Sequence, residues 1–131
     1  MPNIPRILIV DDSPDHRLIL TYQLARIGTF DIREAVDGQQ ALVVSATASP
    51  DLIFMNLGLP LLDGWEAIRR IRALSAPLGQ VPIIAFTAYA GGREEQRARQ
   101  AGCDEYLVKP VLDRGLLQQT VTSLLVRGQH P

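Results

Sequence analysis

Short apolar runs alternate with longer, more polar segments five times along this chain of 131 residues. The run at 52–55 is representative, because Leu, Ile, Phe and Met stand there between Pro50-Asp51 and a loop rich in glycine and proline. A run of this length with turn residues at both ends is typical of a buried strand. Repeated strand-then-helix units imply a parallel sheet with helices on both faces and right-handed crossovers. We therefore expect an α/β fold.

The bounds of the expected elements follow from apolar periodicity and from capping residues. Ser13 is a candidate N-cap with Pro14 at the first helical position, and Gly28 ends that helix. Strands are expected at 6–10, 30–36, 52–55, 81–86 and 105–108. Helices are expected at 14–27, at 39–48, after Asp63, at 93–101 and from Asp113 onward. The last helix is expected to bury Leu116, Leu117, Val121, Leu124 and Leu125, whereas Arg69, Arg70 and Arg72 are expected to face solvent.

Composition narrows the class of protein. The net charge of −1 gives no electrostatic footprint for direct binding to nucleic acid or to a membrane. Cys103 is the only cysteine, which excludes an internal disulfide and favours a reducing compartment. No signal peptide and no membrane-spanning run is evident, so we expect a cytoplasmic protein. We expect one domain at 1–126 and a loose tail at 127–131. His16 is expected on the solvated surface.

Polar residues stand directly after four of the expected strands, where an open α/β sheet places its chemistry. They are Asp11 and Asp12, Asn56, Thr87 and Lys109. Two adjacent carboxylates repel each other unless a cation lies between them, and oxygen ligands favour Mg²⁺. An ammonium and a hydroxyl across from that ion suit a phosphoryl group. A nucleophile is missing, because the amide of Asn56 cannot attack phosphorus as a carboxylate can.

A family resemblance rests on motifs distributed along the chain in order. The chain resembles, over essentially its whole length, the receiver domain of two-component response regulators. The matching motifs are Asp11-Asp12, Leu59-Pro60, Asp63-Gly64, Thr87-Ala88 and Tyr106 with Lys109-Pro110, and Arg17, Leu20, Leu24 and Gly28 also fit. The resemblance implies a flavodoxin-like (βα)5 three-layer sandwich, whose parallel five-stranded sheet has the order 2-1-3-4-5.

The resemblance also implies roles for the site residues. Mg²⁺ is expected on Asp11, Asp12, the residue at position 56 and the backbone carbonyl of Gly58. Thr87 and Lys109 are expected to contact the phosphoryl group, the Lys109-Pro110 bond is expected to be cis, and Tyr106 is expected to switch inward with Thr87. The implied partners are a histidine kinase or phosphotransfer protein, and a downstream protein at the face formed by the fourth helix, fifth strand and fifth helix.

Asn56 departs from the family, whose phosphoacceptor at this position is an aspartate. Either the residue was substituted deliberately to keep the domain unphosphorylated, or this is a natural receiver that has lost phosphorylation. The predicted function is thus a signalling domain for a phosphorelay, not an enzyme, which stands alone or comes from a larger regulator or hybrid kinase. The main alternative is a pseudo-receiver that binds proteins independently of phosphorylation.

Other functions of similar folds fit the sequence less well. A flavin-binding protein needs a hydroxyl- and Gly-rich loop after the first strand, and the acidic loop at 11–15 is electrostatically wrong for a phosphate without metal. A haloacid-type phosphatase needs a second acid two residues after its nucleophile, and Asp11-Asp12-Ser13 lacks that spacing.

Overall fold

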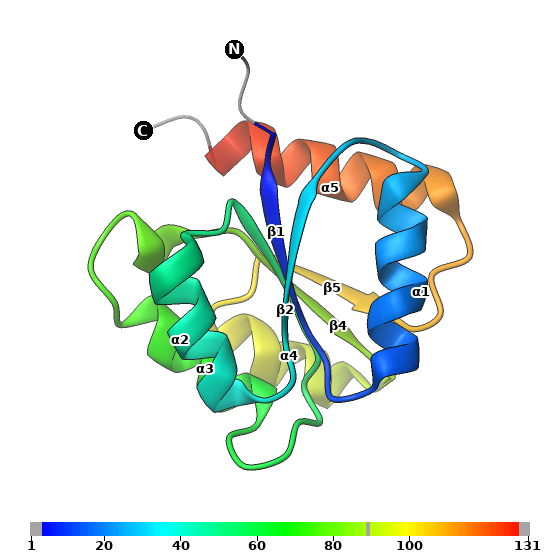
Figure 1. Ribbon diagram of the computed structural model, residues 1–131. Coiled ribbons are helices and arrows are strands. Elements are labelled where there is room, and N and C mark those ends of the chain that lie inside the picture. Colours follow the sequence, from blue (N-terminus) through cyan, green and yellow to red (C-terminus); the bar gives the residue numbers. More distant parts are fainter. Residues whose placement is uncertain (1–3, 89, 129–131) are drawn as a thin grey trace.

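Five parallel strands form the sheet of the computed structural model, which describes residues 4–88 and 90–128. The strand order is β2-β1-β3-β4-β5, which confirms the expected flavodoxin-like topology (Figure 1). The strands are β1 (Arg6–Val10), β2 (Asp31–Ala35), β3 (Leu52–Met55), β4 (Ile83–Thr87) and β5 (Glu105–Val108). All residues of β3 and β4 are buried, because helices cover both faces of the sheet there.

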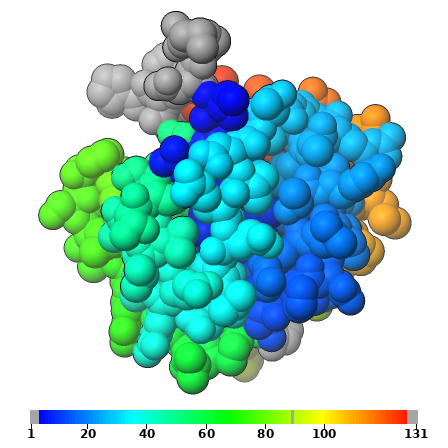
Figure 2. All heavy atoms as spheres, in the orientation of Figure 1, coloured from blue at the N-terminus to red at the C-terminus, as the bar shows by residue number. Residues whose placement is uncertain are grey.

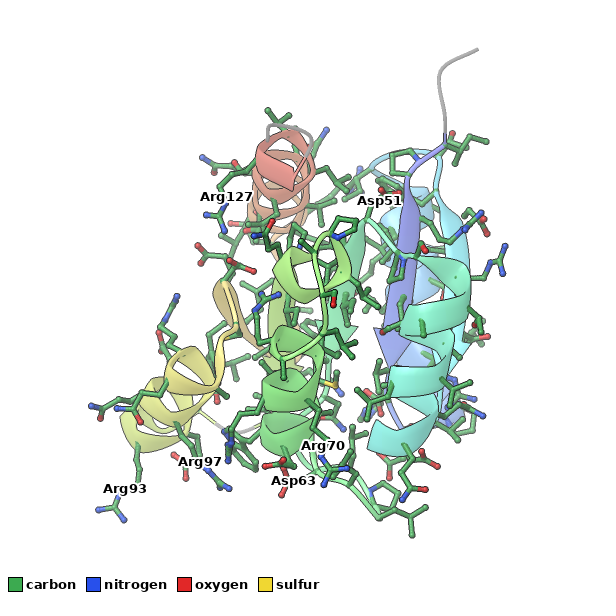
Figure 3. The ribbon with its side chains drawn as sticks, turned by 90° about the vertical axis from the view of Figure 1, so that its left-hand side faces the viewer. Asp51, Asp63, Arg70, Arg93, Arg97 and Arg127 are labelled. Atoms are coloured by element: carbon green, nitrogen blue, oxygen red, sulfur yellow. The ribbon has the colours of Figure 1, made fainter. Side chains whose placement is uncertain are left out.

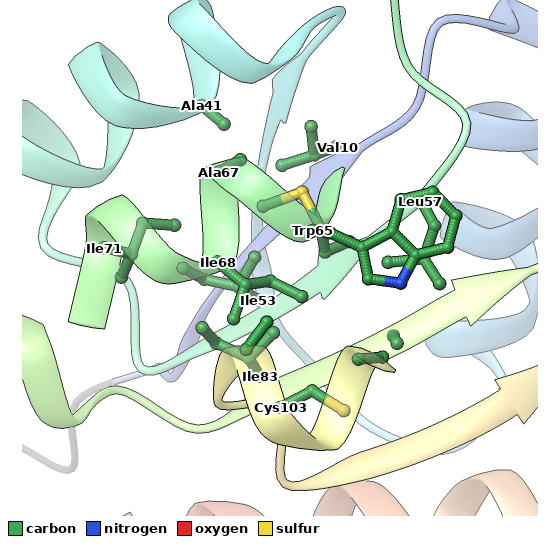
Figure 4. Packing of buried hydrophobic residues seen from close by; sticks show 14 of the residues in the cluster. Val10, Ala41, Ile53, Leu57, Trp65, Ala67, Ile68, Ile71, Ile83 and Cys103 are labelled. Atoms are coloured by element: carbon green, nitrogen blue, oxygen red, sulfur yellow. The ribbon is translucent and has the colours of Figure 1, made fainter. Parts of the chain in front are cut away.

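Helices form the outer layers of the sandwich (Figure 1). They are α1 (Pro14–Ala25), α2 (Gly38–Ala48), α3 (Gly64–Arg72), α4 (Gly92–Ala101) and α5 (Arg114–Gly128), with a 3-10 turn at Leu78–Gln80. Successive strand residues point to opposite faces, so Ile7 and Ile9 pack with α1 and α5, while Leu8 and Val10 pack with α2 and α3. Figure 4 shows the second of these two cores around Ile53 and Ile68.

Side-chain caps begin four of the described helices as local sequence chemistry requires, and for α5 the cap is Asp113, whose Oδ1 accepts the Leu116 N–H at 3.0 Å. Ser13 Oγ accepts a hydrogen bond from the His16 N–H, and Asp63 Oδ1 accepts one from the Glu66 N–H at 2.8 Å. Asp37 does the same for α2. These contacts confirm the predicted caps at Ser13 and Asp63, and each such cap typically contributes about 1 kcal/mol.

The first two helices occupy the side of the molecule that Figure 2 shows. On α1, the side chains of Leu18, Ile19 and Tyr22 are exposed despite their apolar character. None of the helices in the described part of the chain is both long and apolar enough to cross a membrane.

Several predicted bounds differ from the structure. Strand β2 ends at Ala35, because the Val36 N–H turns away to the side-chain oxygen of Gln40 at 2.7 Å. Strand β4 begins at Ile83 and includes Thr87. Helix α5 continues through Gly128, and 129–131, the rest of the expected tail, lie outside the described residues. The prediction that Leu116 is buried was wrong, since its side chain is 45% exposed on the outer face of α5.

The prediction that Arg72 faces solvent was also wrong. Arg69 and Arg70 are exposed and lie within 3.4 and 3.2 Å of the Glu66 carboxylate. The Arg72 side chain is only 22% exposed and points between the layers instead. It donates hydrogen bonds to the three backbone carbonyls of Gly79, Val81 and Gly102 and to the carboxylate of Asp104. Arg72 therefore ties the end of α3 to the starts of β4 and β5.

Candidate functional site

The carboxyl ends of β1 and β3 place Asp11 and Asn56 side by side. Val10 pairs with Met55 in the parallel register, so the residue that follows each of them stands at the same level. The Asn56 N–H donates to the Val10 carbonyl oxygen at 2.9 Å, which extends the ladder by one residue. The apolar runs thus end at the same point, and the next side chains belong to one edge of the sheet.

The ends of β4 and β5 meet the same edge. Thr87 pairs with Val108, and the Lys109 N–H donates to the Thr87 carbonyl oxygen at 2.8 Å. Thr87 is 1% exposed. The Lys109-Pro110 peptide bond is cis, as the resemblance implies, and the Ala76-Pro77 bond is cis as well.

Asp11 and Lys109 form a buried ion pair at the centre of this edge. Their side chains are 4% and 11% exposed, and the Lys109 ammonium contacts Asp11 Oδ2 directly. The other carboxylate oxygen, Oδ1, accepts the Ser13 N–H at 3.0 Å. The ammonium also lies 5.5 Å from the centroid of the Phe86 ring. Asp12, in contrast, is exposed to solvent.

His16 lies in the first turn of α1, at the rim of the site. Its Nδ1 lies 3.3 Å from Lys109 Nζ and 3.7 Å from Asp11 Oδ2, while half of the side chain stays exposed. The side chain is thus solvent-exposed, as expected. Its place as the third residue of a helix that begins beside the acidic pair brings it near the ion pair as well.

The loop after β3 is held tightly against the start of α3. The Gly64 N–H donates to the Leu57 carbonyl oxygen at 2.9 Å. A Cβ atom on Gly64 would lie 2.2 Å from the Asn56 carbonyl oxygen, so this close approach requires glycine. Asn56 itself is half-buried, and Gly58 is exposed in the loop two residues further along. The backbone that carries Asn56 is therefore fixed by α3.

Tyr106 lies on β5, half-buried against the core formed with α2, α3 and α4. Burial, and then the negative charges of Glu94 and Glu95, raise the pKa of Tyr106 above its ordinary value. The strand that carries Tyr106 packs against α4. Its expected role as a switch partner of Thr87 stays a prediction.

The donor chemistry at this edge fits a hard cation. Two carboxylates from Asp11 and Asp12, an amide oxygen from Asn56 and the backbone carbonyl of Gly58 are oxygen donors of the kind that Mg²⁺ takes. The described residues contain no group of three or more His, Cys, Asp or Glu side chains that could hold a metal ion. The site therefore offers two carboxylates, and an aspartate at position 56 would add a third.

Comparison with known proteins decides the family. The family profile for the response regulator receiver domain matches residues 7–122. The chain belongs to the receiver domain family. It is 36% identical over 132 residues to the sensor protein GacS of Pseudomonas syringae pv. syringae, and this match covers 97% of the chain and 14% of GacS. It is 33% identical over 124 residues to the transcriptional regulatory protein PrrA of Mycobacterium tuberculosis, which covers 95% of the chain and 52% of PrrA. This receiver domain thus spans about half or less of the length of these relatives.

Solved structures share the fold closely. The receiver domain of the sensor histidine kinase PA1611 from Pseudomonas aeruginosa PAO1 is 34% identical, with a TM-score of 0.83 over 95% of this receiver domain and 99% of that chain. That structure has a magnesium ion coordinated in its active site cleft. A putative response regulator from Chloroflexus aurantiacus J-10-fl is 28% identical, with a TM-score of 0.87 over 95% of this chain and 100% of that one.

Proposed function

We propose that Asn56 occupies the phosphoacceptor position of this receiver domain and holds the domain in its unphosphorylated state. The supporting observation is that Asn56 follows β3 beside Asp11, at the edge that also carries Thr87 and Lys109. A phosphoryl group is accepted by an attacking carboxylate oxygen. The amide of Asn56 has no such nucleophile, because its nitrogen lone pair is delocalised and its oxygen is weakly basic.

We further propose that Asp11, Asp12, the Asn56 amide oxygen and the Gly58 carbonyl hold Mg²⁺. When bound, the ion neutralises negative charge on a phosphoryl group. Lys109 competes with any such cation, because its ammonium already neutralises the Asp11 carboxylate. One carboxylate fewer than in an aspartate-containing receiver lowers the charge of the site, so this chain binds Mg²⁺ more weakly. The magnesium in the active site cleft of the PA1611 receiver domain supports the choice of ion.

Thr87 and Lys109 are the residues that would contact a phosphoryl group if position 56 carried an aspartate. Both are buried at the same edge, where a hydroxyl and an ammonium stabilise developing negative charge. Tyr106 would then follow Thr87 inward. Because receiver domains are signalling modules, these residues serve a phosphotransfer that a kinase initiates, not an independent enzymatic reaction.

We propose two kinds of partner for the domain. The first is a histidine kinase or phosphotransfer protein, which fits the sensor kinases among the relatives. The second is a downstream protein at the face of α4, β5 and α5, where Val108 is 38% exposed. That face carries a pocket of about 260 Å³, which is lined by Glu105, Leu116, Gln119, Thr120, Ser123, Leu124 and Arg127. The net charge of −1 does not favour direct contact with nucleic acid.

Asn56 itself favours a second candidate function, in which the domain binds its partner independently of phosphorylation. The two functions differ in one respect that can be measured. A receiver with only its acceptor blocked regains its chemistry with Asn56→Asp, because every supporting residue is present. A domain that binds its partner independently of phosphorylation does not regain this chemistry with Asn56→Asp.

The test is a titration with Mg²⁺ and beryllofluoride, a phosphoryl analogue, followed by the fluorescence of Trp65. We expect the native protein to bind Mg²⁺ weakly and to ignore beryllofluoride. The Asn56→Asp variant should bind Mg²⁺ more tightly and respond to beryllofluoride, and Asn56→Ala serves as the control that lacks any side-chain ligand. Mg²⁺ affinity of the native protein equal to that of Asn56→Asp would contradict the proposal.

A further inference from the structure

Trp65, the only tryptophan, lies at the first turn of α3 and contacts a neighbouring helix with both its ring and its N–H. The side chain is 8% exposed and belongs to the same buried cluster as Leu57 (Figure 4). Its indole Nε1 lies 3.4 Å from the Glu94 carbonyl oxygen, to which it donates a long hydrogen bond. The guanidinium carbon of Arg97 lies 4.1 Å from the ring centroid, well inside the range of a cation–π contact.

These contacts involve α4, which buries little apolar surface. Only Ala98 and Ala101 are buried on α4, and both are too small to bury much apolar surface. The N-cap of α4 is Gly91, which makes no side-chain capping hydrogen bond. Arg99 ties the last turn of α4 to Asp104 and Glu105, so the stacked guanidinium of Arg97 and the indole N–H act on the earlier turns.

Trp65 also adjoins the loop that carries Asn56. Trp65 follows Gly64 directly, and the Gly64 backbone is packed on the Asn56 carbonyl and bonded to that of Leu57. A shift of this loop therefore moves the base of the indole ring. α3 is also the helix with which α4 packs. The ring thus lies between the candidate acceptor loop and α4.

We propose that Trp65 is a latch that couples the position of α4 to the loop containing Asn56, through its ring on Arg97 and its N–H on Glu94. The regulatory meaning of the latch rests on the proposed function, since α4 belongs to the proposed partner-binding face. A change at position 56 is transmitted along the Gly64 backbone to the indole ring and from there to α4. This path runs through α3.

Arg93 and Arg97 offer a matched pair of variants. They stand four residues apart on α4, and both are exposed arginines of the same helix. Figure 3 shows Arg93 pointing away from the molecule, whereas Arg97 lies on the side of α4 that faces α3. Arg97→Gln removes the cation from the ring, and Arg93→Gln makes the same change in charge and helix propensity without touching it.

The test is native-state amide hydrogen exchange by NMR on the full chain without metal or phosphoryl analogue. We expect Arg97→Gln to raise exchange in α4 about fivefold and to raise exchange of the Gly64 amide measurably, while Arg93→Gln changes both less than about twofold. Quenching of Trp65 fluorescence by acrylamide should increase in Arg97→Gln alone, because the guanidinium no longer covers the ring.

Unchanged α4 exchange in Arg97→Gln, or an equal rise in Arg93→Gln, would overturn the latch. A rise confined to α4 that leaves the Gly64 amide unchanged would overturn the coupling to the loop. None of these rates depends on the chemistry of Asn56. Failure of the proposed function would instead appear as absent beryllofluoride binding by Asn56→Asp, so the two failures are distinguishable.

Discussion

Replacing Arg72 by methionine should destabilise the fold far more than replacing its exposed neighbours on α3. Methionine keeps an unbranched apolar side chain but removes every donor. The guanidinium donates to the Gly102 carbonyl at 2.9 Å, to the Val81 carbonyl at 2.6 Å and to the Asp104 carboxylate at 2.9 Å. Asp104 also accepts the Ile83 N–H, so the variant leaves a strand-bonded carboxylate with the exposed guanidinium of Arg127 as its remaining ion-pair partner in the described part of the chain.

The size of the expected loss in free energy of unfolding follows from the burial of the Arg72–Asp104 ion pair. Removing one partner of a fully buried ion pair costs about 3–5 kcal/mol, because the other charge stays buried without compensation. The Arg72 and Asp104 side chains are each 22% exposed, so water replaces part of the lost interaction, and Arg127 still pairs with Asp104. The variant also leaves the carbonyls of Gly79, Val81 and Gly102 without the Arg72 donor. We therefore expect Arg72→Met to lower the free energy of unfolding by about 2–3 kcal/mol.

Urea denaturation followed by Trp65 fluorescence and by circular dichroism measures this change. Arg69→Met is the matched control, since Arg69 is exposed and forms its ion pair with the exposed Glu66 across 3.4 Å. Its free energy of unfolding should change by less than about 0.5 kcal/mol. A loss of under about 1 kcal/mol in Arg72→Met, or equal losses in both variants, would refute the reasoning.

Two further predictions concern buried groups. Ser45 Oγ is fully buried and lacks a hydrogen-bond partner in the described part of the chain, so Ser45→Ala should raise the free energy of unfolding by about 1 kcal/mol. Urea denaturation checks this, and a clear loss of stability would contradict it. Burial raises the pKa of the Cys103 thiol from 9.0 to about 11. Between those values the unfolded chain loses a proton that the folded protein keeps, so the free energy of unfolding should fall as pH rises. In Cys103→Ala that fall should be smaller, and equal pH profiles of the two proteins would show that the thiol contributes nothing.

The sequence predicts most of the sheet because its strands are short apolar runs with clear ends. β1, β3 and β5 begin and end where the periodicity indicates, since both their faces are covered or their ends are marked by polar residues. β2 was predicted one residue too long at each end. At its carboxyl end the reason is that Val36 is apolar, although its N–H bonds to a side chain and leaves the ladder. Local hydrophobicity does not reveal such a competing partner.

Convergence of the strand ends predicts the site in the same way. Asp11, Asn56, Thr87 and Lys109 meet because parallel strands end at one edge. Arg72 was missed because it lies on a polar stretch of helix, where solvent exposure is the default expectation. The partners of Arg72 lie up to 32 residues away, and three of them are backbone carbonyls, which carry no signal in the sequence.

Intact-mass spectrometry after incubation with acetyl phosphate and Mg²⁺ tests the central role of Asn56 most directly. We expect no added mass on the protein with Asn56, because the amide cannot attack phosphorus. We expect a phosphate-sized gain on Asn56→Asp, where Lys109 and Thr87 support the new nucleophile. A phosphate-sized gain on the native protein would contradict the blocked-acceptor account. No gain on Asn56→Asp would contradict it too, in favour of a domain that binds its partner without phosphorylation.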